Sequence, residues 1–194
     1  MPRPDRSAER RAELLPIVAA AFAELGYRRT STADLAQRCD VRVNILYRLW
    51  PDKRAMFVDS IRHVFEGSLA TWEKRLASID DPADGLAQLL RYEGRHLGEH
   101  GLYRILFAAL GETDDPDIHA ALVDTYGRFV RFIRVQVAAS RGLGPKAGGQ
   151  GVELAAWAIV GLGTVANIGR ELGLLSPRQR ERLLTEVGAL AAQD

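Results

Sequence analysis

Residues 26–57 read GYRRTSTADLAQRCDVRVNILYRLWPDKRAMF, and this stretch decides the fold of the chain. Gly26 is a typical helix stop, and Ser31, with an acidic residue three positions later, forms a capping box that opens a short helix. Residues 39–41 then form a tight turn, in which Asp40 is one of the few non-glycine residues that tolerate a left-handed conformation. A second short helix follows over about 42–49. The stretch therefore predicts a helix-turn-helix, whose second helix enters the major groove of DNA.

The side chains of this motif suit contacts with a DNA duplex. Arginine binds guanine edges or phosphates, asparagine binds adenine, and valine contacts the thymine methyl group, so the expected base contacts are Arg42, Val43, Asn44 and Arg48. Basic and hydroxyl side chains around them are expected to bind the phosphate backbone and so to position the head on the duplex. These side chains are Thr30, Ser31, Tyr47 and Lys53. The alternative is a three-helix packing motif with solvated arginines.

Helical periodicity dominates the rest of the chain, and no alternating strand pattern is evident. Asp52 is expected to cap a long fourth helix, and further helices are expected over about 82–98, 102–111, 116–141, 152–172 and 177–192. Ser176 and Pro177 make a favoured start for the last of them. We predict an all-α fold of about nine helices, with a three-helix head (residues 1–53) that binds DNA and a larger helical body (residues 54–194) for ligand binding and dimerisation.

Charge and composition narrow the function. Residues 1–54 hold 11 Lys and Arg against 7 Asp and Glu, whereas the rest holds 15 against 18, so the front of the chain suits a polyanion. A single cysteine, Cys39, excludes an internal disulfide and fits a reducing cytoplasm, where we expect the protein to act. The most apolar segment, 154–168, is shorter than the ~20 residues that cross a bilayer, so no membrane anchoring is expected.

The spacing of the head resembles the N-terminal domain of the TetR family of transcriptional regulators, over about residues 10–57. The residues that carry the resemblance are Gly26-Tyr27, Thr30-Ser31, Leu35-Ala36, Val41, Leu46-Tyr47, Trp50 and Lys53. Three departures from the family's pattern bear on the operator sequence. Asp40 replaces a glycine, Arg42 replaces a common serine cap and so weakens the start of the second helix, and Arg48-Leu49-Trp50 stands where His/Tyr-His-Phe is frequent.

The resemblance implies a C-terminal body that dimerises and binds a small-molecule effector. Dimerisation also follows from the sequence, since one recognition helix reads few base pairs and segment 153–170 is rich in small residues that let helices approach closely. We expect a homodimer through the last two helices, although a helix buried in the monomer core would show the same composition. The aromatic residues expected to line an apolar pocket, with Glu93 and His96 orienting the effector, are Trp72, Tyr92, His96, Tyr103, Phe107, Tyr126, Phe129 and Trp157.

The expected partner is a double-stranded DNA operator, and three other classes of function remain as alternatives. Glu93, His96 and His100 lie on one helix face at metal-ligand spacing, but a carboxylate-bridged metal enzyme needs a second such motif, which is missing. No enzyme activity, metal or cofactor is therefore expected. A nonspecific architectural binder needs a larger positive excess. A TetR-like activator and a repressor released by a mostly apolar ligand have the same sequence features, and we favour the repressor.

Overall fold

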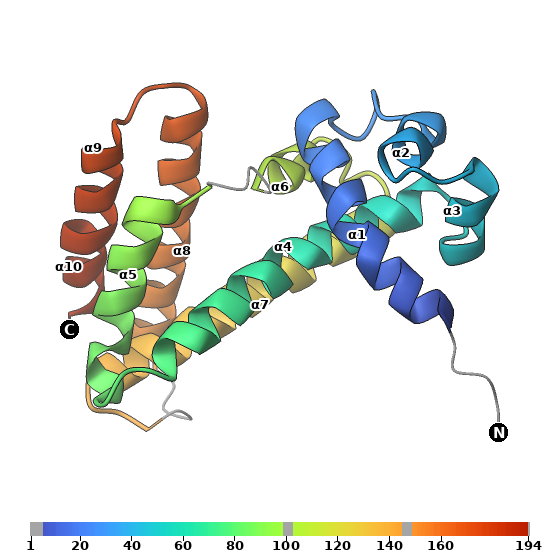
Figure 1. The fold of residues 1–194 in the computed structure, drawn as a ribbon. Coiled ribbons are helices and arrows are strands. Elements are labelled where there is room, and N and C mark those ends of the chain that lie inside the picture. The colour runs from blue at the N-terminus through green and yellow to red at the C-terminus, as the bar shows by residue number, and fades with distance from the viewer. Residues whose placement is uncertain (1–5, 99–102, 145–148, 194) are drawn as a thin grey trace, which may run out of the picture. The chain divides into compact units, whose positions relative to one another are not determined.

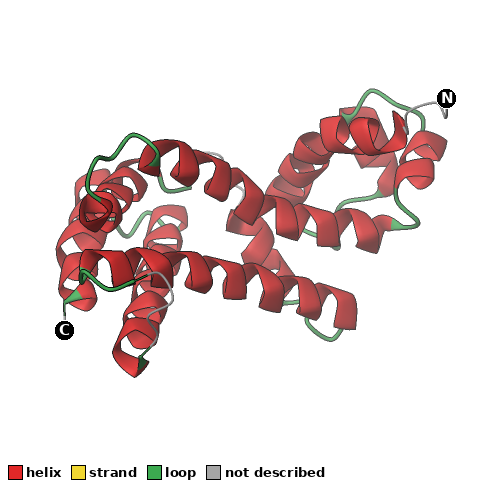
Figure 2. Ribbon diagram, turned by 90° about the horizontal axis from the view of Figure 1, so that it is seen from below, coloured by secondary structure: helices red, strands yellow, loops and turns green. Residues whose placement is uncertain are grey.

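The computed structural model describes residues 6–98, 103–144 and 149–193, and in this part of the chain every regular element is a helix (Figures 1 and 2). Two compact units arise from the packing: residues 1–67 with 100–125, and residues 68–99 with 126–194. We call them the N-terminal unit and the C-terminal unit. This division follows packing rather than function, so the predicted functional boundary between residues 53 and 54 stays a prediction.

The N-terminal unit is built on three head helices and the start of a long fourth helix. Its elements are α1 (Arg6–Leu25), α2 (Thr32–Arg38), α3 (Val43–Leu49), the first part of α4 (Lys53–Leu76), α6 (Tyr103–Leu110) and the first part of α7 (Pro116–Ser140). The core of the head is aromatic: the rings of Phe22 and Phe57 lie 5.0 Å apart edge to face, and Tyr27 lies 4.7 Å from Phe57. These contacts join the end of α1 to α4.

The C-terminal unit packs α5 (Gly85–His96), which follows a short 3₁₀ turn (Pro82–Asp84), with α8 (Gln150–Glu171) and a last helix (Figure 1). That last helix runs through α9 (Pro177–Arg182), one π-helical turn (Leu183–Val187) and α10 (Gly188–Ala192). The unit also includes the second part of α7. Its buried core is aliphatic and comes from α5, α7 and α8, with Leu86, Leu90, Val130, Ile133, Val137, Ala138, Val152, Ala155, Ala156 and Ile159, and Ala191 and Ala192 of the last helix pack against it. Burial of this apolar surface is the main force that holds these helices together.

Glycine allows the close approach of α5 to the last helix. A Cβ on Gly94 would lie 2.8 Å from the Cα of Glu181, so only glycine fits at that crossing. Gly188, on the last helix, faces Leu90 of α5. A Cβ on Gly188 would lie 3.0 Å from Cδ1 of the Leu90 side chain. The neighbouring π-helical turn, an irregularity that the sequence pattern does not indicate, places the last helix against both α5 and α8.

The predicted fold class is confirmed. Counting the last helix as one, nine helices of α type lie in the described residues, and Ser176 caps the last of them through a capping box with Gln179, with Pro177 as its first residue. Asp52 caps α4 through the amide of Ala55, at 2.7 Å. Helix α8 is longer than the apolar segment singled out in the sequence. By length and composition alone its 22 residues could cross a membrane, and 33% of its most apolar window is buried in the protein.

Candidate nucleic-acid interface

Helix α2 begins at the predicted capping box. The amide of Asp34 donates to Ser31 Oγ at 3.1 Å, and the amide of Ser31 donates to Asp34 Oδ2 at 2.9 Å. The hydroxyl and amide of Ser31 lower the pKa of the Asp34 carboxyl. The hydroxyl of Ser31 is thus already engaged within the head, and its contact with DNA stays a prediction.

The turn between α2 and α3 has the predicted left-handed residue. Asp40 has φ of 50° and is the single non-glycine residue with positive φ among those that the structure describes. The amide of Val41 returns to the carbonyl of Ala36 at 3.0 Å, which closes the turn. Cys39 is buried here, and burial raises the pKa of its thiol, as expected of a small core residue rather than a reactive one. The turn therefore fixes the path of the chain from α2 into α3.

Helix α3 has a buried side and an exposed side. Leu46 and Trp50 are fully buried, and they anchor the helix to the head. The expected base-contact residues are all exposed: Arg42, Val43, Asn44 and Arg48. Tyr47 is exposed with them, and its hydroxyl lies 3.3 Å from the hydroxyl of Thr32. The structure therefore brings five of the eight predicted DNA-contacting residues together at the start and on the outer side of one helix.

Two predicted phosphate contacts are instead engaged inside the head. Thr30 is completely buried, and its hydroxyl donates to the carbonyl of Gly26 at 2.6 Å. The ammonium of Lys53 donates to the carbonyls of Tyr27 and Thr30, both at 3.1 Å. Both side chains hold the turn between α1 and α2, a role that the sequence reasoning did not assign. Their contacts with phosphate stay predictions, and burial of Thr30 leaves its side chain no path to a phosphate in this conformation.

The N-terminal unit also contains ion pairs that the sequence analysis missed. Arg28 binds Glu112 at 2.7 Å, and Arg54 binds Asp117 at 3.2 Å. The first pair ties the turn after α1 to the turn before α7, and the second ties the first turn of α4 to the first turn of α7. The partners are separated by more than 60 residues in sequence, so no local spacing signals them.

The predicted ligand residues are dispersed. Trp72 and Phe129 are buried with ring centroids 5.7 Å apart, and the indole of Trp72 donates to Glu93 Oε1 at 2.6 Å. Burial raises the pKa of Glu93 although that hydrogen bond opposes the shift. Tyr92 stacks on His96 with ring centroids 4.5 Å apart. These five residues lie around Glu93 in the C-terminal unit, where His96 is exposed, and we call them the aromatic and acidic cluster.

The other predicted ligand residues lie elsewhere. Tyr126 is half-buried, and burial raises the pKa of its hydroxyl. Tyr103 and Phe107 are half-buried on α6 in the N-terminal unit. Trp157 is 50% exposed on α8, among other exposed apolar residues. Their roles in ligand binding stay predictions.

No group of three potential metal-ligating side chains occurs within the described ranges. His100 lies outside those ranges. Glu93 accepts a hydrogen bond from Trp72. The Glu93 and His96 pair is thus part of an aromatic cluster, with no third ligand beside it in the described residues.

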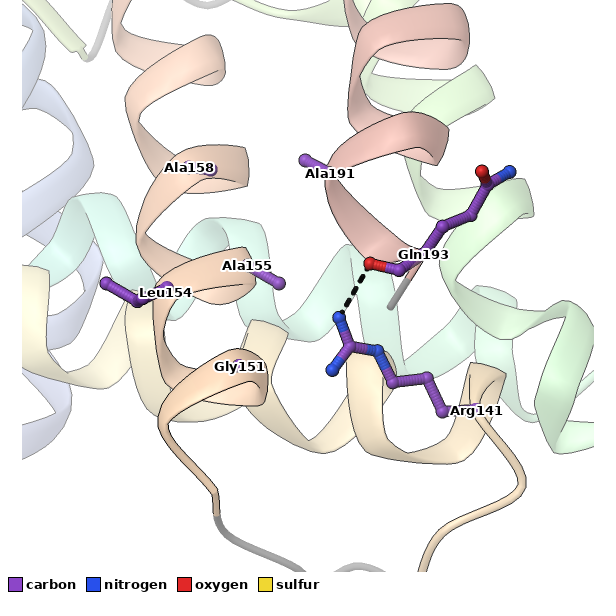
Figure 3. Close-up of a pocket in the computed structure, with 7 residues that line it drawn as sticks. All are labelled: Arg141, Gly151, Leu154, Ala155, Ala158, Ala191 and Gln193. Carbon is purple, nitrogen blue, oxygen red and sulfur yellow. Dashed lines mark hydrogen bonds between the residues drawn. The ribbon is translucent and has the colours of Figure 1, made fainter.

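An apolar surface covers the outer side of α8 and the last helix. Its exposed side chains are Leu154, Trp157, Val165, Ile168 and Leu172 on or directly after α8, and Val187 and Leu190 on the last helix. A groove of about 360 Å³ lies between α8 and α10, beside Leu154 (Figure 3). Arg141 closes one end of the groove and donates to the carbonyls of Ala192 and Gln193, which caps the last helix. Exposed apolar surface of this extent is typical of a protein–protein interface.

Comparison with known proteins identifies this arrangement. Residues 18–59 match the family of bacterial regulatory proteins called the tetR family. Curated protein sequences give no match. Among solved structures, a TetR-family transcriptional regulator from Rhodococcus sp. superposes with a TM-score of 0.79 at 17% identity, over 96% of this chain and 100% of that one.

Two further solved structures were determined with ligands. A transcriptional regulator from Saccharomonospora viridis in complex with choline gives a TM-score of 0.76 at 17% identity, over 92% and 95% of the two chains. The regulator FadR from Bacillus subtilis in complex with stearoyl-CoA gives 0.72 at 14% identity, over 94% and 98%. The matched segment contains α2, α3 and the turn between them, and the likeness of fold covers 92% to 96% of the chain. Residues 18–59 therefore resemble the N-terminal part of tetR-family bacterial regulatory proteins, and the chain has the fold of the solved transcriptional regulators.

Proposed function

We propose that the protein is a sequence-specific DNA-binding repressor that acts in the cytoplasm and leaves a palindromic operator when a small molecule binds. The observation that carries this proposal is the polarity of α3, where Leu46 is buried while Arg42, Asn44 and Arg48 are exposed. A recognition helix needs that arrangement because its outer side chains must reach base edges while its inner side is held rigidly.

Operator binding requires two copies of the head. One α3 reads only a few base pairs, and a two-fold dimer doubles the contacts and fixes the half-site spacing. The apolar surface on α8 and the last helix is the face we assign to this homodimer. Its residues come from the two predicted helices, and water contact of so many leucine and valine side chains is unfavourable in a monomer.

We assign the effector to the aromatic and acidic cluster of the C-terminal unit. The cluster of Trp72, Phe129, Tyr92, His96 and Glu93 supplies apolar surface with polar tips, which suits a small, mostly apolar molecule. Choline and stearoyl-CoA, bound by the two structural neighbours, differ widely in chemistry, so the fold does not select a ligand class. Helix α4 contributes to both units, with Lys53 at its first residue and Trp72 near its end. We infer that a ligand at the cluster shifts α4 and changes the spacing of the two heads.

Footprinting on the DNA upstream of the protein's own gene tests the proposal. We expect protection of a discrete palindrome that survives competition by random DNA at about 200 mM salt. Purely electrostatic binding through six or more phosphate contacts is at least roughly 10³-fold weaker there than at about 50 mM salt. Diffuse protection that disappears with salt would identify an architectural binder instead. A reporter gene behind the protected site then separates repression from activation.

A further inference from the structure

One carboxylate oxygen joins the recognition helix to the rest of the head. Oδ2 of Asp59, on α4, accepts the indole N–H of Trp50 at 2.8 Å and the Nε–H of Arg11 at 2.7 Å. The Nη2 of Arg11 donates to the same oxygen. Trp50 is the C-cap residue directly after α3, and Arg11 belongs to α1. Three N–H groups from two elements therefore converge on a single acceptor from a third element.

The acceptor of this junction is shielded from water. Asp59 is 15% exposed at its side chain and Trp50 is buried, whereas Arg11 is 43% exposed and its guanidinium lies 5.5 Å from the centre of the indole ring. Charge-assisted hydrogen bonds to such a carboxylate are stronger than those between neutral groups, because water competes poorly for the acceptor. The junction therefore holds α1, the end of α3 and α4 in one geometry.

Helix α3 has few other means of fixing its orientation. It is only seven residues long, and its N-cap residue Arg42 makes no side-chain capping hydrogen bond. So short a helix has no stability of its own in water, and its direction depends on tertiary contacts. Tertiary contacts fix it through Leu46 and Trp50, the two buried anchors one turn apart.

Packing against α1 leaves this end of α3 loosely supported. Two open grooves, of about 370 Å³ and 360 Å³, flank Leu49, the last residue of α3. The first is lined by the N-terminal half of α1, and the second by α1 together with Ile45 and Arg48. Because Leu49 is only half-buried and borders both grooves, apolar contacts alone do not set the tilt of the helix there.

We propose that Asp59 is a positioning residue for base recognition: through Trp50 and Arg11 it sets the tilt of α3, and with it the approach of Asn44 and Arg48 to the bases. This inference rests on the proposed function, since it concerns how an operator is told from other DNA. Hydrogen bonds to base edges tolerate displacements of only about 0.5 Å, whereas phosphate contacts carry no sequence information. Loss of the junction therefore lowers discrimination more than it lowers affinity for random DNA.

The test compares Asp59→Asn with a matched control, Glu24→Gln. Glu24 also forms an ion pair in the head, with Arg38 at 2.5 Å, but that pair ties α1 to α2 and leaves α3 untouched. Both substitutions remove one negative charge, so both change nonspecific attraction to DNA alike. We expect Asp59→Asn to lower the ratio of operator affinity to random-duplex affinity by about tenfold, the scale of one lost charge-assisted hydrogen bond, while Glu24→Gln keeps the wild-type ratio.

Trp50→Phe provides a second variant in case Asp59→Asn folds poorly. It keeps most of the buried ring and removes the N–H donor, so it should lower the same ratio, and the double variant should lose less than the product of the two single losses. Partial unfolding reduces the binding-competent fraction for both duplexes equally, so the ratio reports positioning rather than stability. Equal ratios for Asp59→Asn and Glu24→Gln would overturn the inference.

Amide hydrogen exchange separates this inference from the proposed function. In Asp59→Asn we expect faster exchange over residues 46–50 than in the wild type, with α2 unchanged, whether or not an operator has been identified. Unchanged exchange there would also overturn the inference. A wild-type protein that binds operator and random DNA equally would instead defeat the proposed function, and the specificity role of Asp59 with it.

Discussion

The ammonium of Lys53 lies 4.4 Å from the centre of the ring of Tyr27, at the point where α4 meets the turn after α1. The same ammonium donates to two backbone carbonyls of that turn. Burial raises the pKa of Tyr27, with Asp115, Asp52 and Glu112 adding to the shift, so the phenol stays neutral beneath the cation. In this conformation Lys53 therefore acts as a clamp between α4 and the head.

A Lys53→Met variant tests that role. We expect it to lower the free energy of unfolding by about 1–3 kcal/mol, because two carbonyls lose their donor, and to leave the slope of log affinity against log salt unchanged. Lys74→Met, at an exposed position on the same helix, is the control for both measurements. A slope that falls by about one unit in Lys53→Met would show that the ammonium leaves the carbonyls for a phosphate in the complex.

Asn44→Ala tests base readout. Asn44 is exposed, so its substitution should change stability by less than ~0.5 kcal/mol. It should cost about 1–3 kcal/mol of binding to the operator and relax the preference at one base pair, as measured on a panel of single-base variants. Gln37→Ala, exposed on α2, serves as the control. Equal losses on operator and random duplexes would remove Asn44 from the base contacts.

Asp40 tests the backbone of the turn. The left-handed conformation is less favourable for alanine than for aspartate, whose short polar side chain can hydrogen-bond locally. Asp40→Ala should therefore lower the free energy of unfolding by about 1 kcal/mol. Asp40→Gly should stay within about 0.5 kcal/mol of the wild type, because the relief of strain is offset by a more flexible unfolded chain. Chemical denaturation of the three proteins measures the order. A stable Asp40→Ala protein would mean that the turn adopts another conformation in solution.

Much of this fold was predictable because its signals are local. The capping box at Ser31, the left-handed Asp40 and the cap at Ser176 each depend on residues within four positions, and the structure has all three. The helix bounds followed from apolar spacing, a property of each segment by itself. The outer residues of α3 were predictable for the same reason.

Long-range contacts were not predictable from the same patterns. The pair between Arg28 and Glu112 and the convergence of Arg11 and Trp50 on Asp59 join residues that no periodicity relates. Lys53 was predicted to hold a phosphate because its position suits one, yet its geometry relative to Tyr27 depends on how α4 packs on the head. The partners of such side chains depend on how the helices pack on one another, and a single sequence does not show that packing.

Val165→Glu tests the dimer face. Val165 is 52% exposed on α8, and a carboxylate there would lose its hydration in a homodimer, so we expect a shift to monomers and a loss of operator affinity of at least tenfold. Val123→Glu is the matched control, since Val123 is 60% exposed on α7, outside the proposed face. Sedimentation at several protein concentrations measures the change. Monomers for both variants, or dimers for both, would exclude this face.

Glu93 makes the stability of the C-terminal unit depend on pH. Its pKa is raised by burial above the ordinary value of 4.5, so the folded protein holds this proton more tightly than the unfolded chain does. The resulting stabilisation is complete below about pH 4.5 and is lost as the pH rises through the folded pKa.

Glu93→Gln keeps an acceptor for Trp72 and removes the titration. We therefore expect Glu93→Gln to melt at a higher temperature than the wild type at pH 7, with the difference shrinking as the pH falls toward 4.5. Glu73→Gln, exposed on α4, should show no such convergence. A difference between Glu93→Gln and the wild type that stays constant with pH would mean that Glu93 is ionised equally in both states.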